Sequence, residues 1–208
     1  MTDEPRFTEP PKRRTDGEQT HAQILDIAMR LASIEGLGSL TIGRLARELG
    51  VSKSGVFAHF RSKQRLQKET IEAAREIFSR EVTEPALAAP EGLARLEALC
   101  EAFLSYVERG VFPGGCFFAQ ILAEFDAQPG EIRDEVLADQ RDWVSLLEEL
   151  IQDAVRRGEL DKATDVGQLA FELSAALEFS NYLSTLHRDP AIAERGREAV
   201  RGAIARAR

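Results

Sequence analysis

Residues 41–60 read TIGRLARELGVSKSGVFAHF, two short helical patterns joined by a Gly-Val-Ser corner. Leu45 and Leu49 fall on one face of the first pattern, and Thr41 can cap the free N–H groups at its start. Gly50 supplies the backbone freedom that a sharp corner between two helices requires. The stretch therefore predicts a helix-turn-helix.

The second helix of this unit should cover residues 53–59, with Ser52 as its cap. Ala46 is small enough to let the two helices cross closely, and we expect Val51 and Val56 to fill the space between them. The outer side of the second helix carries few bulky apolar residues. This composition is typical of a helix that enters a DNA groove.

The charge of the chain is distributed unevenly. The formal net charge is −8, yet residues 41–70 hold seven basic side chains against two acidic ones, whereas residues 81–208 hold 13 basic against 24 acidic. An electropositive N-terminal part on an acidic body fits a DNA-binding element and discourages non-specific coating of DNA. Fluctuation of charge on helix surfaces is the alternative, and the helix-turn-helix pattern at the same place favours the DNA interpretation.

Composition and cysteine usage exclude several classes of protein. The chain has 208 residues, 43% hydrophobic and 30% charged, which allows one large domain or two small ones. No apolar run approaches the roughly 20 residues that a membrane span needs, and the N-terminus is polar, so we expect a cytoplasmic protein. Cys100 and Cys116 have no metal-ligand spacing with His21, His59 or His187. We therefore expect free, mostly buried thiols, no metal and no cofactor.

The remaining pattern predicts an all-α chain of about nine helices in four parts: a disordered arm over 1–14, a helix-turn-helix domain over 15–62, a connecting helix over 63–84, and a larger helical domain over 85–208. The basic run Lys12-Arg13-Arg14 could reach a minor groove or be a solvated tail. The first helix should start near Thr15 or Thr20 and stop at Gly36. Its expected buried stripe is Ile24, Ile27, Ala28, Leu31 and Ile34.

Helix boundaries further along rest on capping and breaking residues. Ser62 should cap the fourth helix, which we expect to end before Pro85, with Pro85 and Pro90 marking a linker. Later helices are expected near residues 93–110, 116–125, 130–158, 165–186 and 190–204. Nothing in the sequence reads as a strand or as an internal repeat.

Residues 50–66, GVSKSGVFAHFRSKQRL, closely resemble the string G-V-S-K-G-T-L-Y-H-H-F-x-S-K-E-x-L of the tetracycline-repressor (TetR) family. The specific similarity covers residues 20–70, and the rest agrees in helix number and length. The resemblance implies a one-component transcriptional regulator that binds a double-stranded DNA operator. It also implies a C-terminal domain that binds a small-molecule effector and forms a homodimer through its last two helices.

Carried over position by position, the resemblance implies phosphate contacts near the starts of two helices and base-facing positions on the second. The implied DNA-binding residues are Thr41, Arg44, Ser52, Lys53, Ser54, Gly55, Phe57, His59 and Lys63. Phe57 replaces a frequent Tyr and lacks its hydroxyl, Ala58 replaces a frequent His, and Gly55 replaces a common Thr. As apolar residues on a helix face, Phe57 and Phe60 are expected in the core. Base readout should therefore depend on Lys53, Ser54, Arg44 and DNA shape.

Aromatic residues on converging helices, beside the break at residues 113–115, predict a pocket for a largely apolar or aromatic effector. Its expected lining is Phe103, Tyr106, Phe117, Phe118, Ile121, Phe125, Trp143, Leu147, Phe171 and Glu178. Each apolar member could instead be ordinary core. Glu178 could meet a cationic or hydrogen-bonding effector, or lie at the rim of a dimer.

The helix near residues 169–186 is apolar on opposite sides, so it must be covered twice, once by its own domain and once by a partner subunit. The small side chains of the last helix allow close approach. The expected dimer interface is Leu173, Leu177, Tyr182, Ala199, Val200, Ala203 and Ile204. A helix buried inside one monomer is the alternative.

Two other functions remain open at this level. One is a helical small-molecule carrier or enzyme, although no nucleophile with its base, metal cluster or phosphate loop is visible. The other is an activator of the same family, which would differ from a repressor only in where its operator lies.

Overall fold

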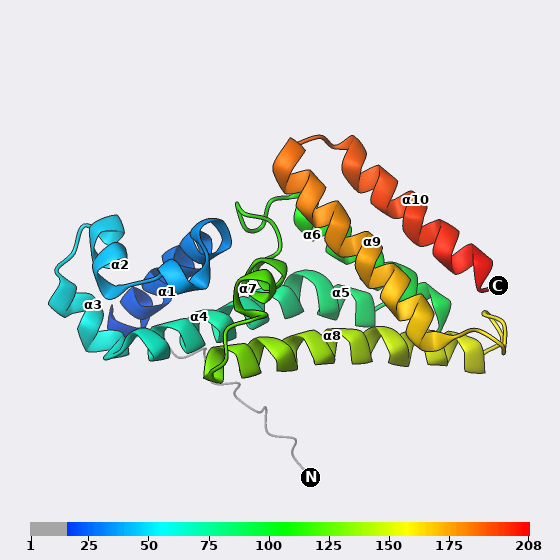
Figure 1. The fold of residues 1–208 in the computed structure, drawn as a ribbon, viewed down its shortest axis with the longest axis horizontal. Coiled ribbons are helices and arrows are strands. Elements are labelled where there is room, and N and C mark those ends of the chain that lie inside the picture. The colour runs from blue at the N-terminus through cyan, green and yellow to red at the C-terminus, as the bar shows by residue number, and fades with distance from the viewer. Residues whose placement is uncertain (1–15) are drawn as a thin grey trace, which may run out of the picture.

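The computed structural model describes residues 16–208, and every regular element in that part of the chain is helical. Figure 1 shows the helix-turn-helix unit at one end of the molecule, two paired helices at the other, and two long helices running between them. The elements in chain order are α1 (Asp16–Glu35), a 3₁₀ turn η1 (Leu37–Ser39), α2 (Ile42–Leu49), α3 (Lys53–Phe60), α4 (Lys63–Phe78), a π-helical turn η2 (Ser79–Thr83), α5 (Glu84–Leu87), α6 (Leu93–Glu108), α7 (Phe117–Phe125), α8 (Glu131–Arg156), α9 (Val166–His187) and α10 (Ala191–Arg206).

The expected arm over residues 1–14 and Thr15 lie outside the described residues. α1 begins at Asp16, so Thr20 is inside the helix rather than its cap. Ile34 is 57% exposed, which corrects its expected place in the buried stripe. Ile34 follows exposed Asp26 and Arg30 at spacings of four residues, so it lies on the outer face of α1, whereas Ala32 and Ser33 in the same turn are buried.

The corner between α2 and α3 forms as the sequence predicts. Thr41 and Ser52 cap the two helices, and Gly50 adopts a left-handed conformation with φ 67°. Ala46 and Val56 are buried between the helices. Val51, in contrast, is 50% exposed because it follows Gly50 on the outside of the turn.

α4 does not stop before Pro85, which corrects the expected linker. The helix passes through η2 into α5, and the N–H of Glu84 donates to the carbonyl of Ser79 in the wide π pattern. Pro85 then falls at the start of α5, where its missing N–H is tolerated. Counted as one run, α4, η2 and α5 bring the described residues to nine helices.

The larger domain packs α6 to α10 around a shared core. Asp165 caps α9 by accepting from the N–H of Gln168 at 3.0 Å, as the sequence predicts. Gly196 lets α10 approach α9, because a Cβ there would lie 2.4 Å from Oγ of Ser180. No helix among residues 16–208 is long and apolar enough to cross a membrane.

Candidate functional site

The first turn of α3 presents small polar groups and one lysine to solvent. Ser52 Oγ accepts from the N–H of Gly55 at 3.1 Å and lies 3.0 Å from Oγ of Ser54. Lys53 is exposed, and its stem lies over α2, where a Cβ on Gly43 would be 3.3 Å from Lys53 Cε. The absence of a side chain at Gly43 therefore lets Lys53 lie close to the start of α2, and within residues 16–208 its ammonium makes no ion pair.

The other end of this surface is the start of α2. Thr41 Oγ1 accepts from the N–H of Arg44 at 3.0 Å. The guanidinium of Arg44 contacts Glu35 at 2.9 Å and Glu48 at 2.6 Å. These bonds raise the pKa of Arg44, and the hydrogen bond from Arg44 lowers the pKa of Glu35. Arg44 is thus paired within the chain, and any contact with DNA requires exchange of those carboxylates.

The two phenylalanines of α3 have different environments. Phe60 is fully buried, as expected, whereas Phe57 is 54% exposed. The core expectation for Phe57 is wrong, because Phe57 lies one position beyond buried Val56 and so turns away from the core. Its exposed ring adds an apolar group to the surface of α3.

His59 and Lys63 lie at the far end of this surface. His59 is half-buried, with its ring centroid 5.5 Å from that of His21. The ammonium of Lys63 donates to the carbonyl of Gly38, so in this structure it is held against η1.

Two arginines that sequence reasoning did not place in the site lie in the same unit. Arg47 on α2 and Arg61 after α3 are exposed, and neither makes an ion pair within the described part of the chain. Both belong to the basic cluster over residues 41–70, which was the available signal. Arg61 has a φ of 61°, the left-handed conformation that ends α3.

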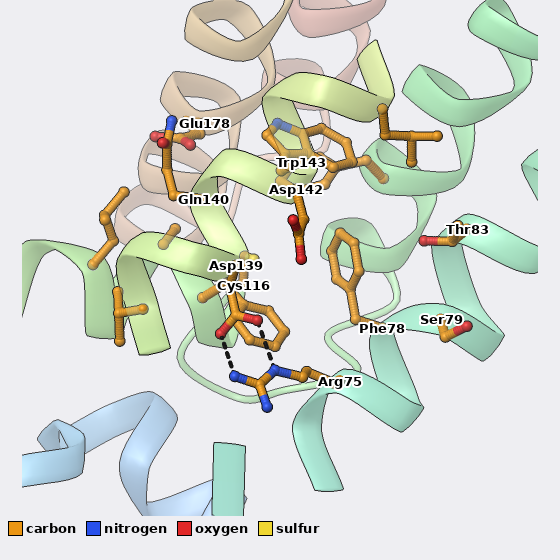
Figure 2. Close-up of a pocket in the computed structure, with 16 residues that line it drawn as sticks. Arg75, Phe78, Ser79, Thr83, Cys116, Asp139, Gln140, Asp142, Trp143 and Glu178 are labelled. Atoms are coloured by element: carbon orange, nitrogen blue, oxygen red, sulfur yellow. Dashed lines mark hydrogen bonds and ion pairs between the residues drawn. The ribbon is translucent and has the colours of Figure 1, made fainter. Parts of the chain in front are cut away.

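A cavity of about 300 Å³ lies where α4, α6, α7, α8 and α9 meet. Figure 2 shows its lining, with Phe78, Trp143 and Asp142 facing the space and Glu178 at the α9 side. The lining residues are Arg75, Phe78, Ser79, Thr83, Phe103, Cys116, Phe118, Ala119, Leu122, Val136, Asp139, Gln140, Asp142, Trp143, Leu146 and Glu178.

The cavity contains four of the residues expected in the pocket: Phe103, Phe118, Trp143 and Glu178. Five others are buried outside its lining: Tyr106, Phe117, Ile121, Phe125 and Leu147. On α7 this division follows the helix period, since residues 117, 121 and 125 form a different face of the helix from the lining residues 118, 119 and 122. Phe171 is 69% exposed and faces solvent, so its expected place in the pocket is wrong.

The α4 contribution to the cavity is the main part that sequence reasoning missed. Phe78 makes edge contacts with Phe118 at 5.6 Å, with Trp143 at 5.8 Å and with Phe103 at 6.3 Å between ring centroids. The aromatic residue at position 78 was visible in the sequence. The contact of Phe78 with Trp143 on α8 could not be predicted, because local periodicity does not show which helices pack together.

An ion pair joins α4 to α8 at the cavity wall. Arg75 binds both carboxylate oxygens of Asp139, at 2.6 and 3.1 Å, and also contacts Glu72 at 2.7 Å (Figure 2). Burial raises the pKa of Asp139, and Arg75 offsets part of that effect. The guanidinium charge of Arg75 is therefore already neutralised within the chain.

Glu178 is the unusual polar group of the cavity. Within residues 16–208 it makes no hydrogen bond and no ion pair, and burial raises its pKa above the ordinary value of 4.5. Cys116 nearby is buried, and burial raises the pKa of its thiol to about 11, as suits an unreactive cysteine. No group of three His, Cys, Asp or Glu in the described residues is placed to hold a metal ion.

Replacement of Glu178 by Gln should stabilise the ligand-free protein at neutral pH. A raised pKa means that the folded protein favours the protonated carboxyl, so its stabilising contribution is present below the unfolded pKa and lost as pH rises through the folded pKa. Because Glu178 keeps contact with solvent, we expect a gain of only about 0.5–1 kcal/mol near pH 7 and about 0 near pH 4. Thermal melting of both proteins at the two pH values measures this gain. An equal difference at both would contradict the assignment.

Direct hydrogen bonds join the cavity-lining α7 to the helix-turn-helix unit. The carboxylate of Glu124, in the last turn of α7, accepts from the N–H groups of Leu37 and Gly38 at 2.7 Å each. From the other side, Gln67 of α4 donates to the carbonyl of Leu37 at 3.0 Å. η1 is thus held between α7 and α4, which are two of the helices that line the cavity.

A second contact between the domains lies at the α6–α7 connection. The N–H of Gly114 donates to Ser33 Oγ at 3.2 Å, and a Cβ on Gly114 would lie 1.7 Å from the carbonyl oxygen of Ser33. Only glycine can therefore pack this connection against α1 in the observed position.

The outer face of α9 carries an apolar stripe, which we call the α9 stripe: Phe171, Ala175, Phe179, Tyr182 and Leu186. Of the residues expected at a dimer interface, Tyr182 and Ala199 are exposed. The others are buried in the core of their own chain: Leu173, Leu177, Val200, Ala203 and Ile204. α9 is apolar on both sides, and most of the residues expected to contact a partner subunit lie on the side that faces the core of their own chain.

The fold and the two sites define a class of protein, the helical regulators of transcription that bind DNA through a helix-turn-helix. Residues 24–70 match the family model "Bacterial regulatory proteins, tetR family", and residues 92–200 match "Tetracyclin repressor-like, C-terminal domain". The chain belongs to the TetR family. The descriptions of both matched models are those of bacterial regulators and tetracycline-repressor-like domains.

Individual relatives agree with this assignment. The chain is 34% identical over 58 residues to the HTH-type transcriptional regulator AcrR of Shigella flexneri, covering 28% of this chain and 27% of AcrR. It spans less than half of the length of the curated relatives that it matches. A TetR transcriptional regulator from Chloroflexus aurantiacus has a similar fold, with a TM-score of 0.83, 23% identity, and coverage of 91% of this chain and 96% of that one. AibR, solved in complex with isovaleryl coenzyme A and operator DNA, has a TM-score of 0.69 at 21% identity, with coverage of 88% and 97%.

Proposed function

We propose that the chain is a cytoplasmic, homodimeric repressor that binds a near-palindromic operator and is released when a small molecule enters the cavity between α4, α6, α7, α8 and α9. The observation that carries this proposal is the hydrogen bonding of η1 by Glu124 and Gln67. These hydrogen bonds connect the DNA-binding unit to α7 and α4, two of the helices that line the cavity.

The DNA-facing part of the proposal rests on the exposed start of α3. In a helix-turn-helix the second helix enters the major groove with its N-terminal residues toward the bases. Lys53 and Ser54 occupy that position here, and Phe57 adds an exposed ring on the same helix. Thr41 and Ser52 would place helix N-termini against phosphates, and Arg47 and Arg61, which make no ion pair within residues 16–208, would add positive charge.

The dimer rests on the α9 stripe, whose members follow one another at spacings of four, four, three and four residues. Such a row of exposed apolar side chains is costly in water and is typical of a helix that packs on a second copy. A twofold axis at α9 and α10 would allow the two copies of α3 to enter successive major grooves, which lie roughly 34–36 Å apart. AibR, which has the same fold, was solved with both a small molecule and operator DNA.

Lys53→Ala tests the DNA-binding surface. We expect a loss of about 1–2 kcal/mol for each half-site, and a reduction of about two in the salt slope of the dimer, because each subunit loses one charge. The measurement is a DNA titration at several salt concentrations, using an operator selected from random duplexes. Lys162→Ala, an exposed lysine between α8 and α9, is the matched control and should change neither quantity. Unchanged affinity and sequence preference in Lys53→Ala would show that α3 is not the recognition helix.

Glu124→Gln tests the link between the domains. An amide of the same shape keeps one acceptor but turns its NH₂ group toward the second backbone donor, so we expect a loss of about 1–2 kcal/mol in the free energy of unfolding. Operator affinity should fall with it, because η1 leads directly into α2. Glu149→Gln on the exposed side of α8 is the control. Wild-type unfolding together with wild-type DNA binding would exclude this link.

A further inference from the structure

We infer that the cavity selects an organic cation, with its charged nitrogen beside Glu178 and its apolar part against the aromatic side chains of α4, α6 and α8. This inference rests on the proposed function only for the role of the cavity in DNA release. The ligand class itself is argued from the charge and the shape of the lining.

The charge balance of the cavity is negative. Its lining holds three carboxylates against a single guanidinium, that of Arg75. Asp139 and Glu72 neutralise the charge of Arg75, so neither Arg75 nor Asp139 contributes to the net charge of the cavity. The charges left over are therefore those of Asp142 and Glu178. In the described part of the chain neither of these two carboxylates makes an ion pair.

Of these two carboxylates, Glu178 says more about the ligand, because burial destabilises its charged form and no positive group in residues 16–208 pairs with it. Its carboxylate accepts no hydrogen bond from any group within residues 16–208. A half-buried carboxylate without a partner is costly unless a ligand supplies one. A cationic nitrogen meets that requirement. A neutral apolar ligand would leave Glu178 unpaired, and an anion would be repelled by it.

The aromatic lining suits the rest of such a ligand. Phe78 presents its edge or face to Phe103, Phe118 and Trp143 at centroid distances between 5.6 and 6.3 Å, and Phe103 lies 5.6 Å from Trp143 at an interplanar angle of 38°. Ring faces attract cations, most strongly those of tryptophan. Trp143 and Asp142 are neighbours on α8, and both face the cavity in Figure 2. The ring of Trp143 and the carboxylate of Asp142 thus lie on the same side of the cavity.

The test uses Trp143, the single tryptophan of the chain, as a fluorescent reporter inside the cavity. Three probes of similar size are titrated: benzyltrimethylammonium, its uncharged carbon isostere neopentylbenzene, and phenylacetate. We expect the wild-type protein to bind the cation at least about tenfold more tightly than either other probe. In Glu178→Gln the cation should lose about tenfold in affinity, while neopentylbenzene should change by less than about twofold.

Two further variants separate charge from folding. Asp142→Asn, at an exposed position on α8, should weaken the cation less than Glu178→Gln does, and Glu149→Gln, outside the cavity, should leave all three affinities unchanged. Equal affinities for the cation and neopentylbenzene, or wild-type cation affinity in Glu178→Gln, would overturn the inference.

A parallel DNA titration keeps the two ideas apart. If benzyltrimethylammonium binds in the expected way and also releases the selected operator, both the ligand class and the proposed function are supported. If it binds with the expected dependence on Glu178 but leaves operator binding unchanged, the ligand class stands and the role of the cavity in release is contradicted.

Discussion

Phe179→Glu should convert the protein from a dimer to a monomer and lower its affinity for a full operator by at least about a hundredfold. Phe179 is at the centre of the α9 stripe and is 63% exposed in the single chain, so the change costs its own fold little. In a twofold interface the substitution occurs twice, and each copy would bury a carboxylate against apolar neighbours. Central aromatic residues of an interface commonly contribute about 2–4 kcal/mol each when truncated.

The measurement is sedimentation of the purified protein over a range of concentrations, followed by titration of a full operator and of a half-site. Leu87→Glu provides the control, since Leu87 is an exposed apolar residue of α5 away from the stripe, at 42% exposure. It should remain dimeric. A dimeric Phe179→Glu protein with unchanged affinity for the full operator would place the interface elsewhere.

Gly114→Ala should destabilise the protein by about 3 kcal/mol and lower its melting temperature by about 6–12 °C. The added methyl would lie 1.7 Å from the carbonyl oxygen of Ser33, and backbone on both sides of this contact would have to move. The connection between α6 and α7 would then separate from α1, which removes the hydrogen bond from the Gly114 N–H to Ser33 Oγ. Operator binding at low temperature should also weaken, because α1 supports α2 and α3.

Differential scanning calorimetry with a DNA titration measures both effects. Gly17→Ala is the matched control: a Cβ at Gly17, in the first turn of α1, has nothing within 4 Å, so this variant should melt at or above the wild-type temperature. If Gly114→Ala melts like Gly17→Ala, the close packing of the two domains at Ser33 does not exist in solution.

The features that the sequence predicts correctly are local ones. Thr41, Ser52 and Asp165 act as helix caps because a cap depends only on the residue and on the three that follow it. The fully buried positions of Phe60 and Val56 follow from helical periodicity within a single short element. The continuation of α4 past Pro85 was missed, since no local signal distinguishes a π turn from a helix end.

The features that were missed depend on which helices face each other. α9 is apolar on two sides with the same period, so the sequence could not decide that Leu173 faces inward and Phe171 outward. Glu178 could be singled out because a carboxylate in an apolar helix is unusual anywhere. Its wall partners on α4 and α8, among them Phe78 and Asp142, are joined to it only by tertiary packing.

In the proposed complex Arg44 would reach DNA with its charge already balanced by Glu35 and Glu48. A salt titration of binding counts the small ions set free when basic side chains replace them on phosphates. If the guanidinium of Arg44 transfers to a phosphate, the two carboxylates that it leaves must take up cations from solution, which cancels part of that release. The slope of such a titration will therefore count Lys53, Arg47 and Arg61 more fully than Arg44. The number of phosphate contacts calculated from that slope would then be lower than the number in the proposed complex.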